Sequence, residues 1–288
     1  MPKKELLKDK YVFSHKIRLW IVGIFIVCLY GKTIKYDFIG LDDKELIVEN
    51  IDYISDFSNL ANAFTTHAFY NPKVAGGSNV YYRPMLTLSF MLDSKLGGVS
   101  PKYYHITNIL LHLIATLLLL KLLVVFKLNE DLAFFFALLF AAHPMLSQAV
   151  GWVPGRNDSL LAVFIIAGFI FLIKYLASQN NKYLFFHILF IGLSLFTKES
   201  AVAFPVVCIF YFLFFKYSSK QFVKPLWALI AGYLIVFLPW YFLRKQVMEH
   251  AVADLSFSSL SKSFIENLPL VLQYFQKSVL PYNLSVLS

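Results

Sequence analysis

Apolar residues gather into long runs along the chain, separated by short polar segments. Seven runs are candidate helices, at residues 17–34, 106–126, 132–152, 160–176, 183–196, 202–217 and 226–243. A hydrocarbon core about 30 Å thick needs about 20 apolar residues per helical span, and most of these runs approach that length. The runs at 183–196 and 202–217 are the shortest. The pattern predicts one all-α polytopic membrane domain of about seven spans, covering residues 1–288.

Composition agrees with a membrane protein. The chain is 58% hydrophobic and 15% charged, whereas soluble domains average about 25% charged residues. Both cysteines, Cys28 and Cys208, lie within apolar runs, where we expect neither a disulfide framework nor a metal site. No small-residue cleavage site follows the first run, so we expect a retained span rather than a signal peptide.

The distribution of charge predicts the orientation. Basic residues crowd the start of the chain, at Lys3, Lys4, Lys8, Lys10, Lys16 and Arg18, which favours a cytoplasmic N-terminus. By alternation of the spans, the inner segments hold 13 Lys/Arg and four acids, and the outer segments hold 13 of each. The net charge of +9 is therefore explained by orientation and by contact with anionic lipid, and we expect no nucleic-acid partner.

This orientation divides the domain into a cytoplasmic tail (1–16), a large outer loop (35–105), a helix bundle (106–243) and an outer segment (244–288). The outer loop is more than a linker, because "FSNLANAF" (57–64) and "YYRPMLTLSFMLDSKL" (81–96) have the half-apolar periodicity of interfacial helices. Between them, "NPKVAGGSN" (71–79) predicts a flexible loop.

Two adjacent carboxylates, Asp42 and Asp43, follow the first span in "FIGLDDKELIVEN" (38–50). A carboxylate at the outer mouth of a helix bundle can act as a general base toward a hydroxyl, and partial burial raises its pKa toward working pH. The alternative is a solvated acidic turn or a helix N-cap. Spacing alone does not separate the two interpretations.

Polar residues also lie at the outer ends of later runs. His105, Asn108 and His112 share one face of the second helix, where they either contact substrate or bond neighbouring helices; two histidines without a third ligand predict no metal site. Pro144 should kink the third helix toward its outer end. Arg156, just outside it, suits a phosphate or a lipid headgroup.

A short turn, "TKES" (197–200), holds Lys198 and Glu199 close to the outer membrane plane. The simplest explanation of these two charges is an isolated ion pair. Because the turn lies on the same side as Asp42, a part in a shared site is the other explanation.

These motifs together resemble a known family. The order "FIGLDD", "YYRP", "YYHITNILLHL", "FAAHPMLSQAVGWVPGRND", "TKESA" and "YFQKSVLPYNLS" is similar to the N-terminal membrane module of the transmembrane-and-TPR-repeat O-mannosyltransferase-like glycosyltransferases. These belong to the GT-C class, which includes the protein O-mannosyltransferases. Members usually continue with further membrane helices and TPR repeats, so we expect a chain that ends at Ser288 to be shortened.

The resemblance implies transfer of a sugar, mannose being the first candidate, from a polyprenyl-phosphate donor to a protein or glycan hydroxyl on the outer face of the bilayer. It implies an aspartate base, Asp42 or Asp43 with Asp42 favoured, and a donor phosphate held by Arg156 and Lys198. No cofactor or metal is expected. Substrate-binding positions with unassigned roles match the motifs at Tyr82, Arg83, His105, His143 and Glu199.

The expected location is a bacterial or archaeal cell membrane, with the endoplasmic reticulum membrane as the alternative. Two other functions compete with sugar transfer. A transporter or flippase for a lipid-linked substrate would also place polar residues within its helices, but it predicts charges through the membrane midplane and repeat-related halves, and neither is found in the sequence. An inactive membrane scaffold would tolerate loss of the acid pair.

Overall fold

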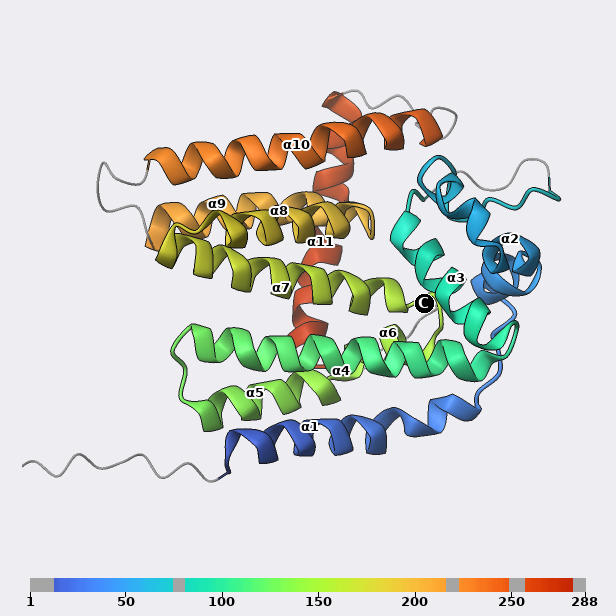
Figure 1. The fold of residues 1–288 in the computed structure, drawn as a ribbon, viewed down its shortest axis with the longest axis horizontal. Coiled ribbons are helices and arrows are strands. Elements are labelled where there is room, and N and C mark those ends of the chain that lie inside the picture. Colours follow the sequence, from blue (N-terminus) through green and yellow to red (C-terminus); the bar gives the residue numbers. More distant parts are fainter. Residues whose placement is uncertain (1–12, 75–80, 216–222, 249–256, 282–288) are drawn as a thin grey trace, which may run out of the picture.

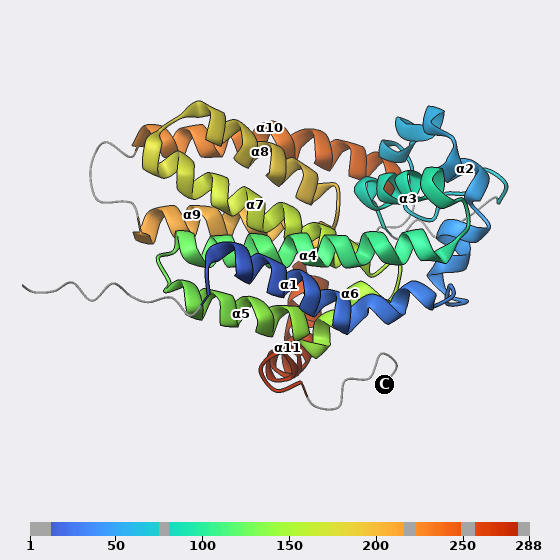
Figure 2. The same ribbon diagram turned by 60° about the horizontal axis from the view of Figure 1, so that its bottom comes forward.

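The computed structural model describes residues 13–74, 81–215, 223–248 and 257–281. Within these ranges every regular element is a helix and no strand occurs, which confirms the predicted all-α class. Figure 1 shows the long helices lying side by side as a bundle, with α2 (Ile51–Ser55) and α3 (Pro84–Gly97) beyond one end of it. The turned view in Figure 2 keeps this arrangement.

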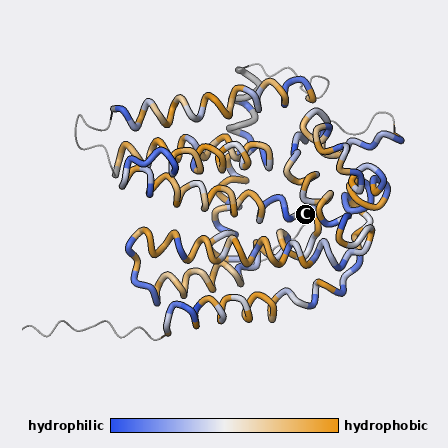
Figure 3. The backbone as a smooth tube through the Cα atoms, in the orientation of Figure 1, coloured by the Kyte–Doolittle hydropathy of each residue, from blue (hydrophilic) through white to orange (hydrophobic). Residues whose placement is uncertain are grey.

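Each predicted apolar run corresponds to a helix. Four helices are long and apolar enough to cross a membrane: α1 (His15–Tyr30, extended by η1 to Lys35), α4 (Pro101–Val125), α7 (Arg156–Ser178) and α10 (Val223–Met248). Two apolar helices are shorter, α8 (Asn181–Leu195) and α9 (Ala203–Phe215). Figure 3 shows how apolar residues dominate the bundle. The chain is a polytopic membrane protein, and the count of seven spans stays a prediction.

The third apolar run is a broken helix. α5 (Glu130–Ala142) ends before Pro144, and after one turn of η5 (Pro144–Leu146) the chain continues as α6 (Ser147–Gly151), bent by 52°. Proline lacks the N–H that would continue the hydrogen-bond ladder, so the predicted kink is confirmed. Counted as one span, the bent pair raises the number of candidate spans to five.

The first long loop packs as a small helical layer with its own core. It contains η2 (Lys44–Val48), α2, η3 (Phe57–Leu60), η4 (Asn62–Phe64) and α3. Residues 57–64 form two short 3-10 helices, so the prediction of one interfacial helix there is wrong. α3 is helical as predicted, but one of its faces is buried against α2 and α4 rather than in lipid. Of the predicted flexible loop 71–79, residues 75–79 lie outside the described ranges.

A tight connection sets the angle between α3 and α4. Gly98 adopts φ +59°, a left-handed conformation that favours glycine. A Cβ at Gly97 would lie 1.9 Å from the ring of Tyr103, so a larger residue would displace this ring. These glycines allow the buried end of α3 to lie against the start of α4.

Ion pairs and hydrogen bonds connect the other helices of the bundle. Near the far end from α3, Arg18 of α1 pairs with Glu130 and Asp131 of α5. Between α7, α8 and α10, the ring of His187 contacts the carbonyl of Gly168 at 2.8 Å and the hydroxyl of Tyr233 at 2.9 Å. Because a carbonyl only accepts, Nδ1 carries the proton and Nε2 accepts from the tyrosine. Both sets are fully explained by helix packing.

The last described helix, α11 (Phe257–Val279), crosses the direction of the bundle helices in Figure 1 and is viewed almost end-on in Figure 2. Near its C-terminal end, the carbonyl of Ser278 lies 2.9 Å from Nε2 of His143. His143, a predicted substrate-binding residue, therefore contacts α11 at the break between α5 and η5.

Candidate active site

A small pocket lies where the loop layer meets the start of α7 and the turn before α9. Its volume is about 90 Å³, the space of about three water molecules in the liquid. Its lining comes from distant parts of the chain: Asp42, Leu46, Ala68, Phe69, Tyr81, Arg83, Leu86, Trp152, Pro154, Gly155, Asn157, Asp158 and Lys198. The fold thus gathers an aspartate and two cations of the predicted site around one cavity.

The two aspartates differ in environment. Asp42 is half-buried and lines the pocket. Asp43 is 1% exposed, and its Oδ2 accepts a hydrogen bond of 2.7 Å from the amide of Ile39. Burial raises the pKa of Asp43 from its ordinary 3.8 to about 6, although the amide of Ile39 and the indole of Trp152 oppose this rise. Asp43 precedes η2, but its side chain caps nothing, so a capping role does not explain it.

The cations of the site are paired with carboxylates on other elements. Lys198 pairs with Asp158 in the first turn of α7, and their side chains are 30% and 55% exposed. Arg83 donates a 3.5 Å hydrogen bond to Glu199 and stacks 4.0 Å from the ring of Tyr81. The interpretation of Lys198 and Glu199 as an isolated pair is therefore wrong, because each pairs with another segment.

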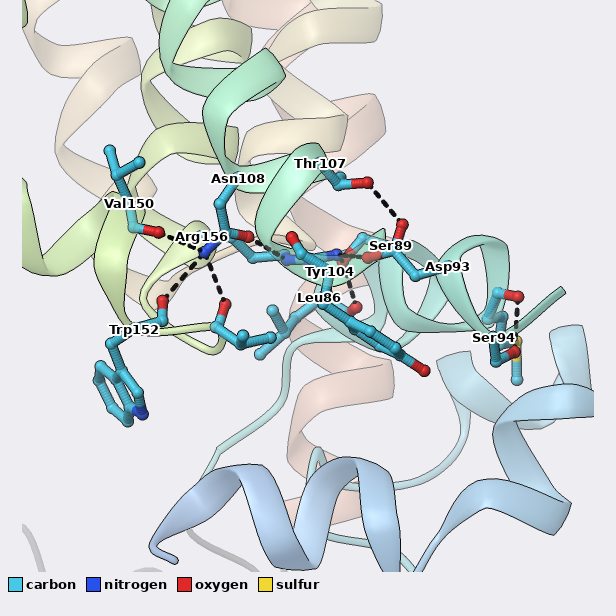
Figure 4. Close-up of polar contacts among 12 residues, drawn as sticks. Leu86, Ser89, Asp93, Ser94, Tyr104, Thr107, Asn108, Val150, Trp152 and Arg156 are labelled. Atoms are coloured by element: carbon cyan, nitrogen blue, oxygen red, sulfur yellow. Dashed lines mark hydrogen bonds and ion pairs between the residues drawn. The ribbon is translucent and has the colours of Figure 1, made fainter. Parts of the chain in front are cut away.

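Arg156 is placed differently from expectation. Its side chain is 0% exposed and forms an ion pair with Asp93 of α3. Nε donates to Asn108 at 2.8 Å, Nη2 to the carbonyl of Tyr104 at 2.8 Å and Nη1 to Ser89 at 3.4 Å. Figure 4 shows this guanidinium enclosed between α3 and α4. The prediction that Arg156 stands just outside the bundle is wrong, and the pocket lining does not include it.

Asn108 completes the same network. Its amide nitrogen donates to the carbonyls of Val150, Trp152 and Val153 at 3.0 to 3.3 Å. Figure 4 shows the carbonyls of Val150 and Trp152 directed at this nitrogen. Together with Arg156 it holds the turn between α6 and α7 in one conformation. We call Arg156, Asp93, Asn108 and Ser89 the arginine network.

The other predicted polar residues divide in two groups. Nε2 of His112 lies 3.1 Å from the carbonyl of Ala141, and the hydroxyl of Tyr82 donates to the carbonyl of Phe64 at 2.7 Å. His112 thus bonds a neighbouring helix, one of its two expected roles, and Tyr82, whose role the sequence left unassigned, connects two segments of the loop layer. His105 is buried, and neither of its ring nitrogens has a hydrogen-bond partner in the described structure. Its ring packs edge-on against the ring of Tyr36, with 6.3 Å between the ring centroids.

The sequence did not single out three residues that line the pocket: Trp152, Asn157 and Asp158 as a partner of Lys198. In the structure, both amide atoms of Asn157 are buried without a hydrogen-bond partner among the described residues. The signal was present in "GWVPGRND", where polar residues follow an apolar run directly.

A larger cavity, of about 600 Å³, lies at the opposite end of α7, between α8 and α10. Its lining comprises Tyr175, Leu176, Gln179, Asn181, Lys224, Pro225 and Ala228, and holds no carboxylate and none of the predicted site residues. Nor do any three His, Cys, Asp or Glu side chains in the described ranges gather closely enough to hold a metal ion. The chemistry therefore favours the smaller pocket.

Comparison with known proteins agrees with the motifs. Residues 84–242, more than half of the chain, match the model of the family described as dolichyl-phosphate-mannose-protein mannosyltransferase. The human protein O-mannosyl-transferase TMTC1 is 33% identical over 214 residues, 70% of this chain and 24% of that protein. Human TMTC2 is 29% identical over 213 residues, covering 70% and 25%.

A relative from Caenorhabditis elegans, the protein O-mannosyl-transferase F38B6.6, is 30% identical over 221 residues, 73% of this chain and 29% of that protein. The chain thus spans about a quarter of the length of the curated relatives it matches. No solved structure matches. Since the family model covers more than half of the chain, the resemblance drawn from the motifs is confirmed, and the chain belongs to the family of dolichyl-phosphate-mannose-protein mannosyltransferases.

Proposed function

We propose that this protein transfers a mannosyl group from a polyprenyl-phosphate donor to a hydroxyl of a protein or glycan acceptor at the membrane surface. The observation that carries the proposal is the pocket that brings Asp42 together with Arg83 and Lys198. A carboxylate and two cations around one cavity supply the charges needed to deprotonate an acceptor and to stabilise a departing phosphate. The family membership supports the same reaction class.

Asp42 is the proposed general base. It is half-buried, it lines the pocket, and a hydroxyl is a weak nucleophile unless a positioned base takes its proton. In a single displacement the acceptor oxygen attacks the anomeric carbon while the bond from that carbon to the phosphate oxygen breaks. Asp42 receives the proton and the lipid phosphate leaves with the bonding electrons. The configuration at the anomeric carbon is inverted.

Lys198 and Arg83 are the proposed phosphate ligands. Lys198 pairs with Asp158, which also lines the pocket, and Arg83 pairs with Glu199. A donor phosphate can replace these carboxylate partners. Fixed cations stabilise the charge that develops on the leaving phosphate. Arg156 was expected in this role, but its burial against Asp93 suits a different task, which is to hold the turn that carries Asn157 and Asp158.

The proposed orientation has the N-terminus in the cytoplasm and the pocket at the outer face of a cell membrane. It rests on the excess of Lys and Arg in the inner segments. The fold supports this orientation as well. Figure 1 shows the start of α1 at one end of the bundle and the loop layer with α2 and α3 at the other, so the two can face opposite sides of a membrane.

The test is sugar transfer by the purified chain in lipid nanodiscs. Radiolabelled polyprenyl-phosphate mannose and a Ser/Thr-rich peptide are supplied, and label in the peptide and in free mannose is measured. We expect label to leave the lipid in a reaction that Asp42→Asn suppresses. Label that moves across the membrane while it stays on the lipid would support a flippase instead, and no loss of label from the lipid would overturn the proposal.

A further inference from the structure

The side chain of Asn157 is buried without hydrogen-bond partners in the described structure. It is 3% exposed, and within the described ranges neither Oδ1 nor Nδ2 has a partner. An unsatisfied buried polar group costs about 1–3 kcal/mol. In native proteins such groups are rare, and each one calls for an explanation such as a ligand that completes it.

A loose local structure does not explain the unpartnered amide. Asn157 follows Arg156 directly, and the turn before it is held by three hydrogen bonds from Asn108 to the carbonyls of Val150, Trp152 and Val153. Asn157 also lines the pocket that contains Asp42. A rigid wall therefore presents unpaired donors and an unpaired acceptor to this cavity.

We propose that Asn157 recognises hydroxyl groups of the transferred sugar, an inference that rests on the proposed function. A side-chain amide offers two N–H donors and one carbonyl acceptor. A sugar hydroxyl both donates and accepts, so neighbouring hydroxyls can satisfy Oδ1 and Nδ2 together. A phosphate diester only accepts, and it would leave Oδ1 unpaired.

The size and charge of the pocket agree with this assignment. A volume of about 90 Å³ admits one edge of a sugar ring and its hydroxyls but no lipid tail. The proposed phosphate ligands, Arg83 and Lys198, each pair with a carboxylate, whereas the amide of Asn157 carries no charge and suits an uncharged group of the donor. A site that hydrogen-bonds a substrate hydroxyl discriminates strongly against analogues that lack it.

The experiment measures binding of two lipids of equal charge to the purified full chain in nanodiscs. One is polyprenyl-phosphate mannose, and the other is the methyl phosphodiester of the same polyprenol, which has no sugar. We expect the parent chain to bind the mannosyl lipid more tightly. Asn157→Ala should reduce this preference about tenfold, the loss of one hydrogen bond at about 1.4 kcal/mol, and should leave affinity for the methyl diester unchanged.

Asn59→Ala is the matched control. Its amide donates to the carbonyl of Tyr53 at 3.0 Å, and it lies outside the pocket lining, so the preference for the mannosyl lipid should persist. Asn157→Leu gives a second variant of similar size with neither donor nor acceptor, and it should also lose the preference.

Three results would count against the inference. If Asn157→Ala and Asn157→Leu both kept the full preference, or if the parent bound both lipids equally, sugar recognition by Asn157 would be wrong while the proposed function stood. If the parent bound neither lipid, the proposed function would fail, and this inference with it.

Discussion

Arg156 and Asn157 are neighbours in the sequence and opposites in the structure. The guanidinium of Arg156 is buried among four hydrogen-bonding partners, whereas the amide of Asn157 is buried without any partner in the described structure. Both are polar groups removed from water, but only the first is satisfied by the fold itself. Arg156 therefore stabilises the scaffold, whereas Asn157 is the group that we propose binds a ligand.

The largest effect should come from breaking the arginine network. Arg156→Met leaves the carboxylate of Asp93, itself buried, without its cation, and losing one partner of a buried pair costs about 3–5 kcal/mol. We expect a large fall in thermal stability in detergent, measured by the unfolding temperature. The double variant Arg156→Met with Asp93→Leu should recover most of it, because no buried charge remains. A single variant as stable as the parent would contradict the scaffold role.

Asp42→Asn should lower the rate of sugar transfer without changing the stability of the fold. The amide keeps the size of the carboxylate but is not a base, so the rate of sugar transfer should fall by about 10²- to 10⁴-fold. Affinity for the donor lipid, measured separately, should stay at the parental value. Asp43→Asn should cost less activity, since Asp43 is absent from the pocket lining. Parental turnover in Asp42→Asn would remove it as the base.

Asp43 should make stability depend on pH. Its pKa is about 6 in the fold and 3.8 ordinarily, so the folded chain binds this proton more tightly. The free energy of unfolding should therefore fall by up to about 3 kcal/mol as pH rises from about 4 to 6, and should not fall further above that range. Asp43→Asn should flatten this part of the stability profile. Asp52→Asn, a change at an exposed acid paired with Lys73, should leave the profile intact.

The smallest effect should come from Lys198 and Arg83, the two cations that line the pocket. Lys198→Met and Arg83→Met each remove a charge-assisted hydrogen bond to the proposed phosphate, worth about 1.5–3 kcal/mol or roughly 10- to 100-fold in donor affinity. Binding of polyprenyl-phosphate mannose to each variant measures the loss. Lys102→Met, an exposed change outside the pocket lining, is the control. Unchanged affinity in both Lys198→Met and Arg83→Met would show that these residues do not bind the donor phosphate.

Much of the fold was determined by the sequence. The apolar runs predicted every long helix of the bundle, because a span must bury its backbone hydrogen bonds within one apolar segment. Pro144 predicted the break between α5 and α6 for a local reason, the missing N–H. The motifs alone were sufficient to identify the family. Asp42 and Lys198 of the "TKES" turn, which the sequence offered as parts of one shared site, line the same pocket.

The roles of individual side chains were decided only by the tertiary structure. Successive residues of a helix point about 100° apart, so the first turn of α7 directs Arg156 between α3 and α4 and Asn157 toward the pocket. Which face meets Asp93 depends on how α3, more than 50 residues earlier, packs on α4. Likewise Lys198 and Glu199 found different partners because their side chains diverge from one turn. Such choices depend on contacts between distant segments, which no local pattern contains.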